Sequence, residues 1–240
     1  MPMAGLGSRF FKEGYLLPKP LIEVDGMPMF TKAISSFHDW KIPMKLSFVV
    51  RREHVEKFKI DKTIKSHFKK AHIVIIDAVT RGSVETSLAV KKFIDKDDGV
   101  LLMDCDLYFE SDKLEESIGN ILDEKSDIKG MLVSFFSNDA RYSYARADEN
   151  GFVLEIAEKK VISVNALAGA YFFSTGKLFL NLAKRLLDQK NIESAEYYTS
   201  LLYNYLLEDK GKIKVVRINK YASFGTPEEL KVYNKTANEH

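Results

Sequence analysis

The sequence predicts an α/β fold with a mainly parallel central sheet and helices on both faces, and three observations support this. Apolar runs at 46–50, 73–76 and 100–103 have the composition of buried strands. Between them, apolar residues recur at roughly helical spacing over 53–68 and 84–94. Strands that alternate with helices in this way are joined by right-handed crossovers, so ligands are expected at the carboxyl ends of the strands.

The second half of the chain predicts a smaller region of mixed strands. The turn Asp148-Glu149-Asn150-Gly151 is a good hairpin signal between two of them. The expected strands are 131–136, 142–147, 152–156, 168–173 and 213–218, and the expected helices are 114–122, 177–187, 196–207 and a last one from Pro227. Pro227 suits the first helical position, and Thr226 before it can cap this last helix.

The composition is that of an ordinary globular protein. A net charge of +2 is too small to indicate a nucleic-acid partner, and no basic run is interleaved with aromatic residues. The lone cysteine, Cys105, cannot form an internal disulfide, and the sequence shows neither a secretory nor a membrane-spanning segment. A cytoplasmic location without a membrane partner is therefore expected, and the oligomeric state stays open.

A glycine-rich loop near the amino terminus predicts a site for a polyphosphate. Gly5 and Gly7 let the backbone approach an anion closely and turn successive N–H groups inward, while Arg9 and Lys19 bring positive charge. The loop residues expected at the site are Ala4, Gly5, Gly7, Ser8 and Arg9. The spacing fits neither a dinucleotide fingerprint nor a P-loop, and a Gly-x-Gly alone is also typical of an ordinary turn.

Two carboxylates, Asp104 and Asp106, directly follow the predicted strand 100–103. Residues two apart on an extended chain point to the same face, so both can meet one divalent cation. Magnesium, with manganese as a possible substitute, suits these hard oxygens and keeps waters and substrate phosphates as its other ligands. The alternative is a pair of solvated acids at a strand end. Cys105 points to the opposite face and is expected to be a packed side chain.

A second glycine lies in the segment 80–86, after the second predicted strand. A glycine before a helix start leaves room for a flat base to approach the backbone and exposes N–H groups. Thr80, Gly82 and Ser83 are therefore candidate nucleotide contacts. An ordinary strand-to-helix turn explains the same residues equally well.

Taken together, these motifs resemble those of the sugar-nucleotide pyrophosphorylases, or nucleotidyltransferases. That family combines a glycine-rich loop, an arginine and a Pro-Lys-Pro, which here is Pro18-Lys19-Pro20. The resemblance covers nearly the whole chain and implies a Rossmann-like GT-A fold in one domain, 1–240. It implies a nucleotide- and metal-binding half at 1–125, with Asp106 as the metal ligand, and an acceptor-binding half at 126–240.

The same resemblance assigns the acceptor side of the site. Glu158-Lys159 is similar to the family's Glu-Lys-Pro, whose lysine meets the phosphate of the acceptor. Gly169 lies in a segment that usually reads Asn-Ala-Gly-Ile-Tyr. The resemblance therefore implies acceptor contacts from Glu158, Lys159 and Gly169. It also implies that Lys159, Arg9 and Lys19 are the side-chain cations that neutralise phosphate charge in the reaction.

Some positions depart from the family's pattern. Leu167 replaces an asparagine that touches the sugar in many members, which puts an ordinary hexose-1-phosphate acceptor in doubt. Ser223 replaces a second metal-binding aspartate, and Glu196 is the candidate replacement, although a glutamate in a first helical turn is also explained by capping. Only the residues Met1–Met3 precede the glycine loop, so the first strand is expected to be trimmed or very short.

The expected activity is transfer of a nucleotidyl group from a nucleoside triphosphate, here CTP, to a small phosphorylated acceptor. An acceptor phosphate is ionised near neutral pH and attacks without a general base. The motifs look most like a subgroup found with capsule and surface-polysaccharide biosynthesis, and within it like cytidylyltransferases that use phosphoglutamine. The alternatives are a sugar-1-phosphate nucleotidyltransferase, a metal-dependent glycosyltransferase and a non-catalytic nucleotide sensor.

Overall fold

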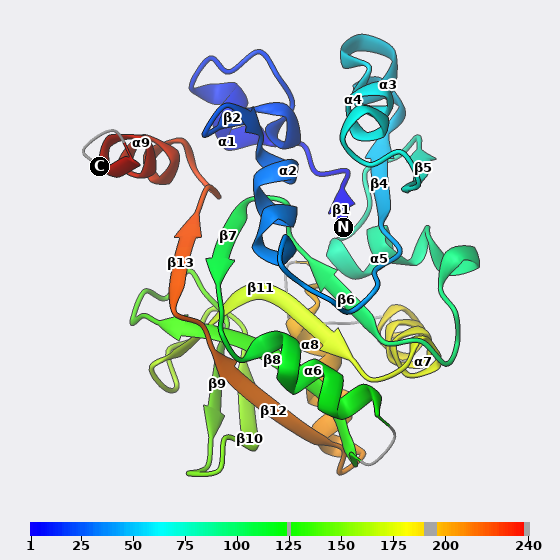
Figure 1. Cartoon of the computed structure of the whole chain (residues 1–240), viewed down its shortest axis with the longest axis vertical. Coiled ribbons are helices and arrows are strands. Elements are labelled where there is room, and N and C mark those ends of the chain that lie inside the picture. The colour runs from blue at the N-terminus through cyan, green and yellow to red at the C-terminus, as the bar shows by residue number, and fades with distance from the viewer. Residues whose placement is uncertain (124–125, 190–195, 238–240) are drawn as a thin grey trace. The chain divides into compact units, whose positions relative to one another are not determined.

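The computed structural model describes residues 1–123, 126–189 and 196–237, which form two compact units (Figure 1). Unit 1 contains 1–80, 104–110 and the described part of 220–240, and unit 2 contains the described parts of 81–103 and 111–219. Parallel and mixed sheets with covering helices confirm the predicted α/β class. The expectation of one domain with halves at 1–125 and 126–240 stays a prediction.

Unit 1 contains the parallel sheet. Strand β4 (Ser47–Arg51) lies between β1 (Pro2–Met3) and β5 (His72–Ile76), and both neighbours run parallel to it. Helices α3 (Arg52–Phe58) and α4 (Ile60–His67) connect β4 to β5. The single helix expected over 53–68 is thus broken, because Lys59 between the two helices takes a left-handed φ of +55°.

The remaining elements of unit 1 come from its first segment, from 104–110 and from its last segment. They are α1 (Ser8–Lys12), η1 (Lys19–Leu21), β2 (Glu23–Val24), β3 (Met27–Pro28), α2 (Met29–Ile34), η2 (Ser35–Phe37), β7 (Leu107–Glu110), β13 (Lys220–Ser223) and α9 (Pro227–Ala237). Strands β7 and β13 form an antiparallel ribbon. Phe10 and Ile22 from the first segment pack in one buried cluster with Phe224 and Leu230 from the last.

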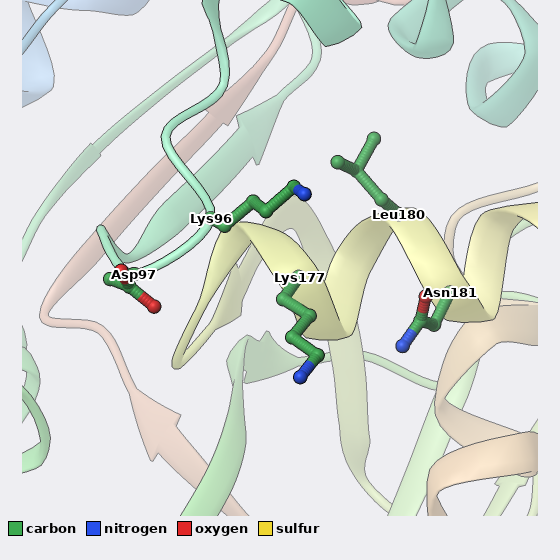
Figure 2. Close-up of a pocket in the computed structure, with 5 residues that line it drawn as sticks. All are labelled: Lys96, Asp97, Lys177, Leu180 and Asn181. Atoms are coloured by element: carbon green, nitrogen blue, oxygen red, sulfur yellow. The ribbon is translucent and has the colours of Figure 1, made fainter.

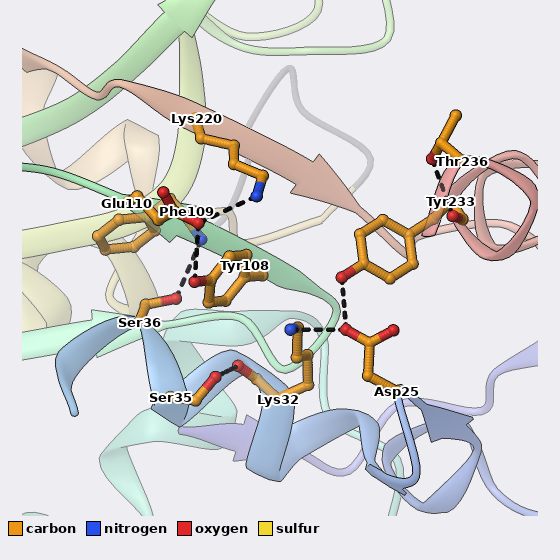
Figure 3. Close-up of polar contacts among 10 residues, drawn as sticks. All are labelled: Asp25, Lys32, Ser35, Ser36, Tyr108, Phe109, Glu110, Lys220, Tyr233 and Thr236. Carbon is orange, nitrogen blue, oxygen red and sulfur yellow. Dashed lines mark hydrogen bonds and ion pairs between the residues drawn. The ribbon is translucent and has the colours of Figure 1, made fainter. Parts of the chain in front are cut away.

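A polar network also joins these segments (Figure 3). The Asp25 carboxylate, in the β2–β3 turn, pairs with Lys32 Nζ at 2.7 Å and accepts a hydrogen bond from the Tyr233 hydroxyl at 2.6 Å. Lys32 Nζ also lies 4.2 Å from the centre of the Tyr108 ring on β7. The turn, α2, β7 and α9 therefore share one set of contacts.

Unit 2 is built on a mixed sheet with β11 (Asn165–Phe173) near its middle. Its order is β10 (Val153–Ala157), β9 (Tyr144–Ala147), β11, β8 (Ile128–Phe136) and β12 (Lys212–Arg217), with β6 (Val100–Met103) also paired to β11. In this sheet β12 and β8 pair in parallel, and the other pairs of described strands are antiparallel. The third predicted strand, 100–103, is present as β6 and pairs antiparallel with β11, a partner that a short apolar run does not specify.

Helices cover both faces of this sheet. They are α5 (Ser83–Leu88), η3 (Lys91–Phe93), α6 (Leu114–Leu122), α7 (Gly176–Leu187) and α8 (Ser200–Glu208). Helices α7 and α8 share a core with Leu132, Tyr171 and Phe173, and α6 lies on the opposite face (Figure 1). The helix expected over 84–94 continues only as a 3₁₀ turn after Leu88. In the described residues, the helices are too short or too polar to cross a membrane.

The buried hydroxyl of Tyr203 gives a first test of this core. Tyr203, on α8, is 0% exposed, and its hydroxyl donates to the Phe172 carbonyl at 2.7 Å and lies 3.2 Å from the Met131 carbonyl. Tyr203→Phe removes this buried hydrogen bond, so we expect the free energy of unfolding to fall by about 0.5–1.5 kcal/mol. Urea denaturation measures this. Tyr205→Phe on the same helix is the control, and equal stability of both variants would contradict the assignment.

Candidate active site

In unit 1 the glycine loop lies against the Pro-Lys-Pro segment. Gly7 has a left-handed φ of +62°, and a Cβ at this position would lie 3.3 Å from Lys19 Cβ. Around Gly5 a Cβ would meet no atom within 4 Å. Gly7 therefore allows close packing on Lys19, while Gly5 leaves the backbone open to a ligand.

The predicted loop cation and the predicted metal ligand lie side by side. Lys19 Nζ forms an ion pair with the Asp106 carboxylate and lies 3.4 Å from the Gly225 carbonyl. Burial, the largest influence, lowers the pKa of Lys19, but the charges and hydrogen bond of the neighbouring carboxylates outweigh it and raise this pKa overall. Both side chains stay partly accessible, at 21% for Lys19 and 24% for Asp106, so a ligand can reach them.

Oxygen atoms gather around Gly225, at the end of the β7–β13 ribbon. A Cβ on Gly225 would lie 3.0 Å from Glu229 Oε2 and 3.4 Å from both Asp106 Oδ2 and Ser223 Oγ. The Asp106 carbonyl also accepts the Phe224 N–H at 2.7 Å, which fixes the end of β7 to this turn. The lack of a side chain at Gly225 is what leaves this oxygen-lined space.

These donors fit a magnesium ion by their chemistry. They are hard oxygens, of the kind that magnesium prefers. The described residues hold no group of three or more His, Cys, Asp or Glu side chains that could hold a metal ion, so an ion here would need ligands from a substrate as well. A cation here would depend on Asp106, on Asp104 in the same short connection between β6 and β7, and on substrate phosphates. Glu196, the predicted replacement for the aspartate missing at Ser223, is exposed and belongs to unit 2.

Sequence reasoning overlooked Glu229. Its carboxylate accepts the Thr226 N–H at 2.9 Å, and its own N–H donates to Thr226 Oγ1 at 3.2 Å. This is the reciprocal capping box of helix α9, and the Thr-x-x-Glu spacing could have revealed it. The predicted cap at Thr226 is therefore present, and it brings a carboxylate to the space around Gly225.

The other residues expected in this part are placed as follows. Ala4 is buried, Ser8 and Arg9 are exposed at the start of α1, and Thr80 is half-buried. Cys105 is buried beside the hydrophobic core of unit 1, and burial raises the pKa of its thiol to about 12. The thiol therefore stays protonated near neutral pH, as expected for a packed side chain.

In unit 2 the second glycine loop is packed on the backbone of Tyr197. Gly82 has φ +151° and ψ −177°, and a Cβ there would lie 2.6 Å from Tyr197 N and 2.7 Å from Tyr197 O. The Tyr197 N–H donates to the Arg81 carbonyl at 2.9 Å, and the Val84 N–H donates to the Tyr197 carbonyl at 3.1 Å. Two hydrogen bonds and a glycine-only contact thus fix the loop that carries Gly82 and Ser83.

The turn with Glu158 and Lys159 is held by side chains that the sequence did not reveal. Lys159 takes a left-handed φ of +52°, and its Nζ donates to the Tyr198 hydroxyl at 2.6 Å. The Glu158 carboxylate accepts hydrogen bonds from Ser143 and, at 2.5 Å, from Ser200. The hydrogen bond from Lys159 to Tyr198 is the main cause of a raised pKa at Lys159, so this lysine keeps its positive charge near neutral pH.

Gly169 lies in an irregular stretch of β11. It has φ +80°, and the β11–β8 pairing shifts register between Leu167 and Tyr171 around it. Leu167 is only 4% exposed and belongs to the core of unit 2. The leucine that replaces the family's asparagine is thus part of the hydrophobic packing.

A separate cavity of about 340 Å³ lies at the start of α7 (Figure 2). Its lining residues are Lys96, Asp97, Lys177, Leu180 and Asn181. None of the candidate site residues is among them. The cavity is therefore distinct from the loops described above.

Comparison with known proteins finds one family whose model matches this chain. The model of the nucleotidyl transferase family matches residues 3–238. A search of curated proteins gives no match. Solved structures with the same fold include a nucleoside-diphosphate-sugar pyrophosphorylase from Vibrio cholerae RC9, with TM-score 0.82 and 24% identity over 98% of this chain and 100% of that one.

Two further structures are similar in fold. A putative glucose-1-phosphate thymidylyltransferase from Bacillus anthracis, in complex with a sucrose, has TM-score 0.78 and 17% identity over 100% of this chain and 94% of that one. The inositol-1-phosphate CTP transferase from T. maritima has TM-score 0.75 and 13% identity over 98% and 93%. The family match spans nearly the whole chain and agrees with these folds, so the chain belongs to the nucleotidyl transferase family.

Proposed function

We propose that this protein transfers a nucleotidyl group from a nucleoside triphosphate, CTP in the first instance, to a small phosphorylated acceptor and releases pyrophosphate. The observation that carries the proposal is the pairing of Lys19 with Asp106 directly beside Gly7. A lysine that packs on a glycine loop and contacts a carboxylate joins the two features that triphosphate binding requires, fixed positive charge and a cation ligand.

In the proposed reaction an oxygen of the acceptor phosphate attacks the α-phosphorus of the triphosphate. The bond from that phosphorus to the bridging oxygen breaks, and its electron pair leaves with pyrophosphate. The attacking oxygen is already ionised, so no side chain needs to take a proton. The protein's task is to hold two anions in line and to neutralise the charge that develops.

Three cations would share this task. Lys19 and Arg9 would hold the triphosphate, and Lys159 would hold the acceptor phosphate. Asp106 and Asp104 would hold magnesium, or manganese in its place, and the metal when bound would neutralise phosphate oxygens. Thr80, Gly82 and Ser83 would contact the nucleotide, and Glu158 and Gly169 would contact the acceptor.

The narrowest form of the proposal is a cytoplasmic enzyme that makes CDP-glutamine from CTP and phosphoglutamine for capsule or surface-polysaccharide precursors. The motif resemblance to capsular cytidylyltransferases supports it. The burial of Leu167 also supports it, because a core leucine offers no amide to a hexose. The fold similarity to an inositol-1-phosphate CTP transferase is compatible with CTP as the nucleotide.

A sugar-1-phosphate nucleotidyltransferase is the second candidate. It is favoured by the fold similarity to a sugar pyrophosphorylase and to a putative glucose-1-phosphate thymidylyltransferase. A nucleotide sensor without activity is the third, and the serine at position 223 is the argument for it.

One assay separates these candidates. The protein is mixed with magnesium, each of the four ribonucleoside triphosphates or dTTP, and a panel of acceptors that includes phosphoglutamine and hexose-1-phosphates, and pyrophosphate is followed. We expect release with CTP and phosphoglutamine, and mass spectrometry identifies the product. Release with a sugar phosphate alone would favour the second candidate, and binding of nucleotide without any release would favour the sensor.

A further inference from the structure

Residues 197–200 form a short segment between two loops of unit 2, and we name it the coupling segment. On one side it contacts the loop 81–84, the proposed nucleotide loop. On the other it contacts the turn 158–159, the proposed acceptor turn. The two loops are far apart in sequence, so their shared contacts come from the fold.

Alternate residues of the coupling segment face the nucleotide loop. The backbone of Tyr197 exchanges hydrogen bonds with Arg81 at 2.9 Å and Val84 at 3.1 Å. Thr199 Oγ1 lies at hydrogen-bond distance, 3.0 Å, from Ser83 Oγ. The Arg81 guanidinium also lies over the Tyr197 ring, 4.6 Å from its centre, and donates to the Tyr197 hydroxyl at 3.1 Å. This side is held by both main-chain and side-chain contacts.

The intervening residues face the acceptor turn. The Tyr198 hydroxyl accepts a hydrogen bond from Lys159 Nζ at 2.6 Å, and the lysine lies 4.5 Å from the centre of the Tyr198 ring. Ser200 donates to the Glu158 carboxylate at 2.5 Å. The two side chains proposed to meet the acceptor are therefore both positioned by the coupling segment.

The coupling segment is packed too tightly to move alone. Tyr197, Thr199 and Ser200 are buried, with exposures of 6%, 5% and 0%. Gly82 also touches the Tyr197 backbone so closely that no Cβ fits between them. Packed elements of this kind transmit small shifts, because they have few alternative arrangements.

We propose that residues 197–200 couple the two loops, so that a triphosphate bound at 81–84 orders the turn 158–159 and strengthens binding of the acceptor. Tyr198 is then a positioning residue for Lys159. This inference rests on the proposed function, because it takes the nucleotide and acceptor roles of the two loops from it. Coupling between sites is reciprocal, so the acceptor strengthens nucleotide binding by the same factor, and such factors are about 5- to 150-fold.

Hydrogen–deuterium exchange of the full chain with magnesium tests the coupling without knowledge of the acceptor. CTP is the first probe, and ATP, GTP, UTP and dTTP follow in parallel. In the natural sequence we expect the effective triphosphate to slow exchange at 81–90 and also at 157–161. Protection at the second segment is the signature of coupling.

Two variants each remove one side-chain contact of the coupling segment, one on each side. Thr199→Val removes the contact with Ser83, and Tyr198→Phe removes the hydrogen bond from Lys159 but keeps the ring. In each we expect protection at 81–90 to persist and protection at 157–161 to fall to less than half. Tyr205→Phe, which removes a hydroxyl from a ring that packs on Arg185 of α7, is the matched control and should behave as the natural sequence does.

The outcomes separate this inference from the proposed function. If the natural sequence shows protection at 81–90 but none at 157–161, the coupling is wrong while the nucleotide role stands. Full protection of 157–161 in both variants would equally overturn the coupling, since the removed contacts would then have no part in it. If no triphosphate protects 81–90, the nucleotide role of this loop fails, and the coupling falls with it.

Discussion

Replacement of Lys19 by methionine is expected to lower turnover about 10²- to 10³-fold, the loss typical when one preorganised donor that stabilises charge in a transition state is removed. The methionine keeps much of the apolar stem that packs beside Gly7 but removes the ammonium that contacts Asp106. If the charge acts mainly in the transition state, kcat and kcat/KM should fall together. Steady-state kinetics of pyrophosphate release measures both.

The matched control for this variant is Lys12→Met. Lys12 is an exposed lysine on the neighbouring helix α1, so the same chemical change there should leave turnover within about twofold of the natural sequence. Thermal unfolding of Lys19→Met should stay close to that of the natural sequence, because the ion pair is partly accessible to water. Retained turnover in a folded Lys19→Met protein would remove the main support for the proposed function.

Replacement of Gly82 by alanine is expected to have the largest effect on structure and activity together. The backbone at φ +151° and ψ −177° is a region that almost only glycine occupies, and occupying it with another residue costs about 1–3 kcal/mol. The new Cβ would also lie 2.6 Å from Tyr197 N, and such overpacking costs about 1–3 kcal/mol more. We therefore expect a lower melting temperature and at least tenfold slower pyrophosphate release.

Gly151→Ala serves as the comparison. Gly151 also has a left-handed φ, +77°, but a Cβ there would meet only the Val215 carbonyl at an ordinary 3.5 Å. This variant carries the backbone cost without the overlap, so differential scanning calorimetry should show a smaller loss of stability, with normal turnover. If Gly82→Ala matches Gly151→Ala in both properties, the contact with Tyr197 does not hold the loop.

Much of the fold could be predicted from the sequence because the strands are strongly apolar. The runs at 46–50 and 73–76 match β4 and β5 within a residue, since a buried strand and a hydrophobic run coincide. The pairing of 100–103 with β11 could not be predicted, because the two strands lie far apart along the chain. The break at Lys59 was missed because helical spacing continues across it in the apolar residues.

The sequence predicted less of the candidate site where its side chains contact residues far away in the sequence. Lys19 and Asp106 were recognisable by motif, and the structure brings them into contact. Tyr198 and Ser200 were not, because a hydrogen bond to Lys159 or Glu158 leaves no local pattern. Glu229 had a local signal, the capping box, but only the three-dimensional turn at Gly225 shows that this cap lies near Asp106.

Unit 1 is built from segments far apart in the sequence, so it can be completed only late in synthesis. Its buried cluster combines Phe10 and Ile22 with Phe224 and Leu230, and Lys19 contacts both Asp106 and Gly225. During synthesis, the segment 1–80 therefore cannot complete its packing until the last segment of unit 1 has been made. Most of unit 2 is synthesised between them as nearly continuous chain. Long-range closure of this kind is slow. A nascent chain that ends before Gly225 would contain the glycine loop, but it would lack the late residue whose carbonyl contacts Lys19.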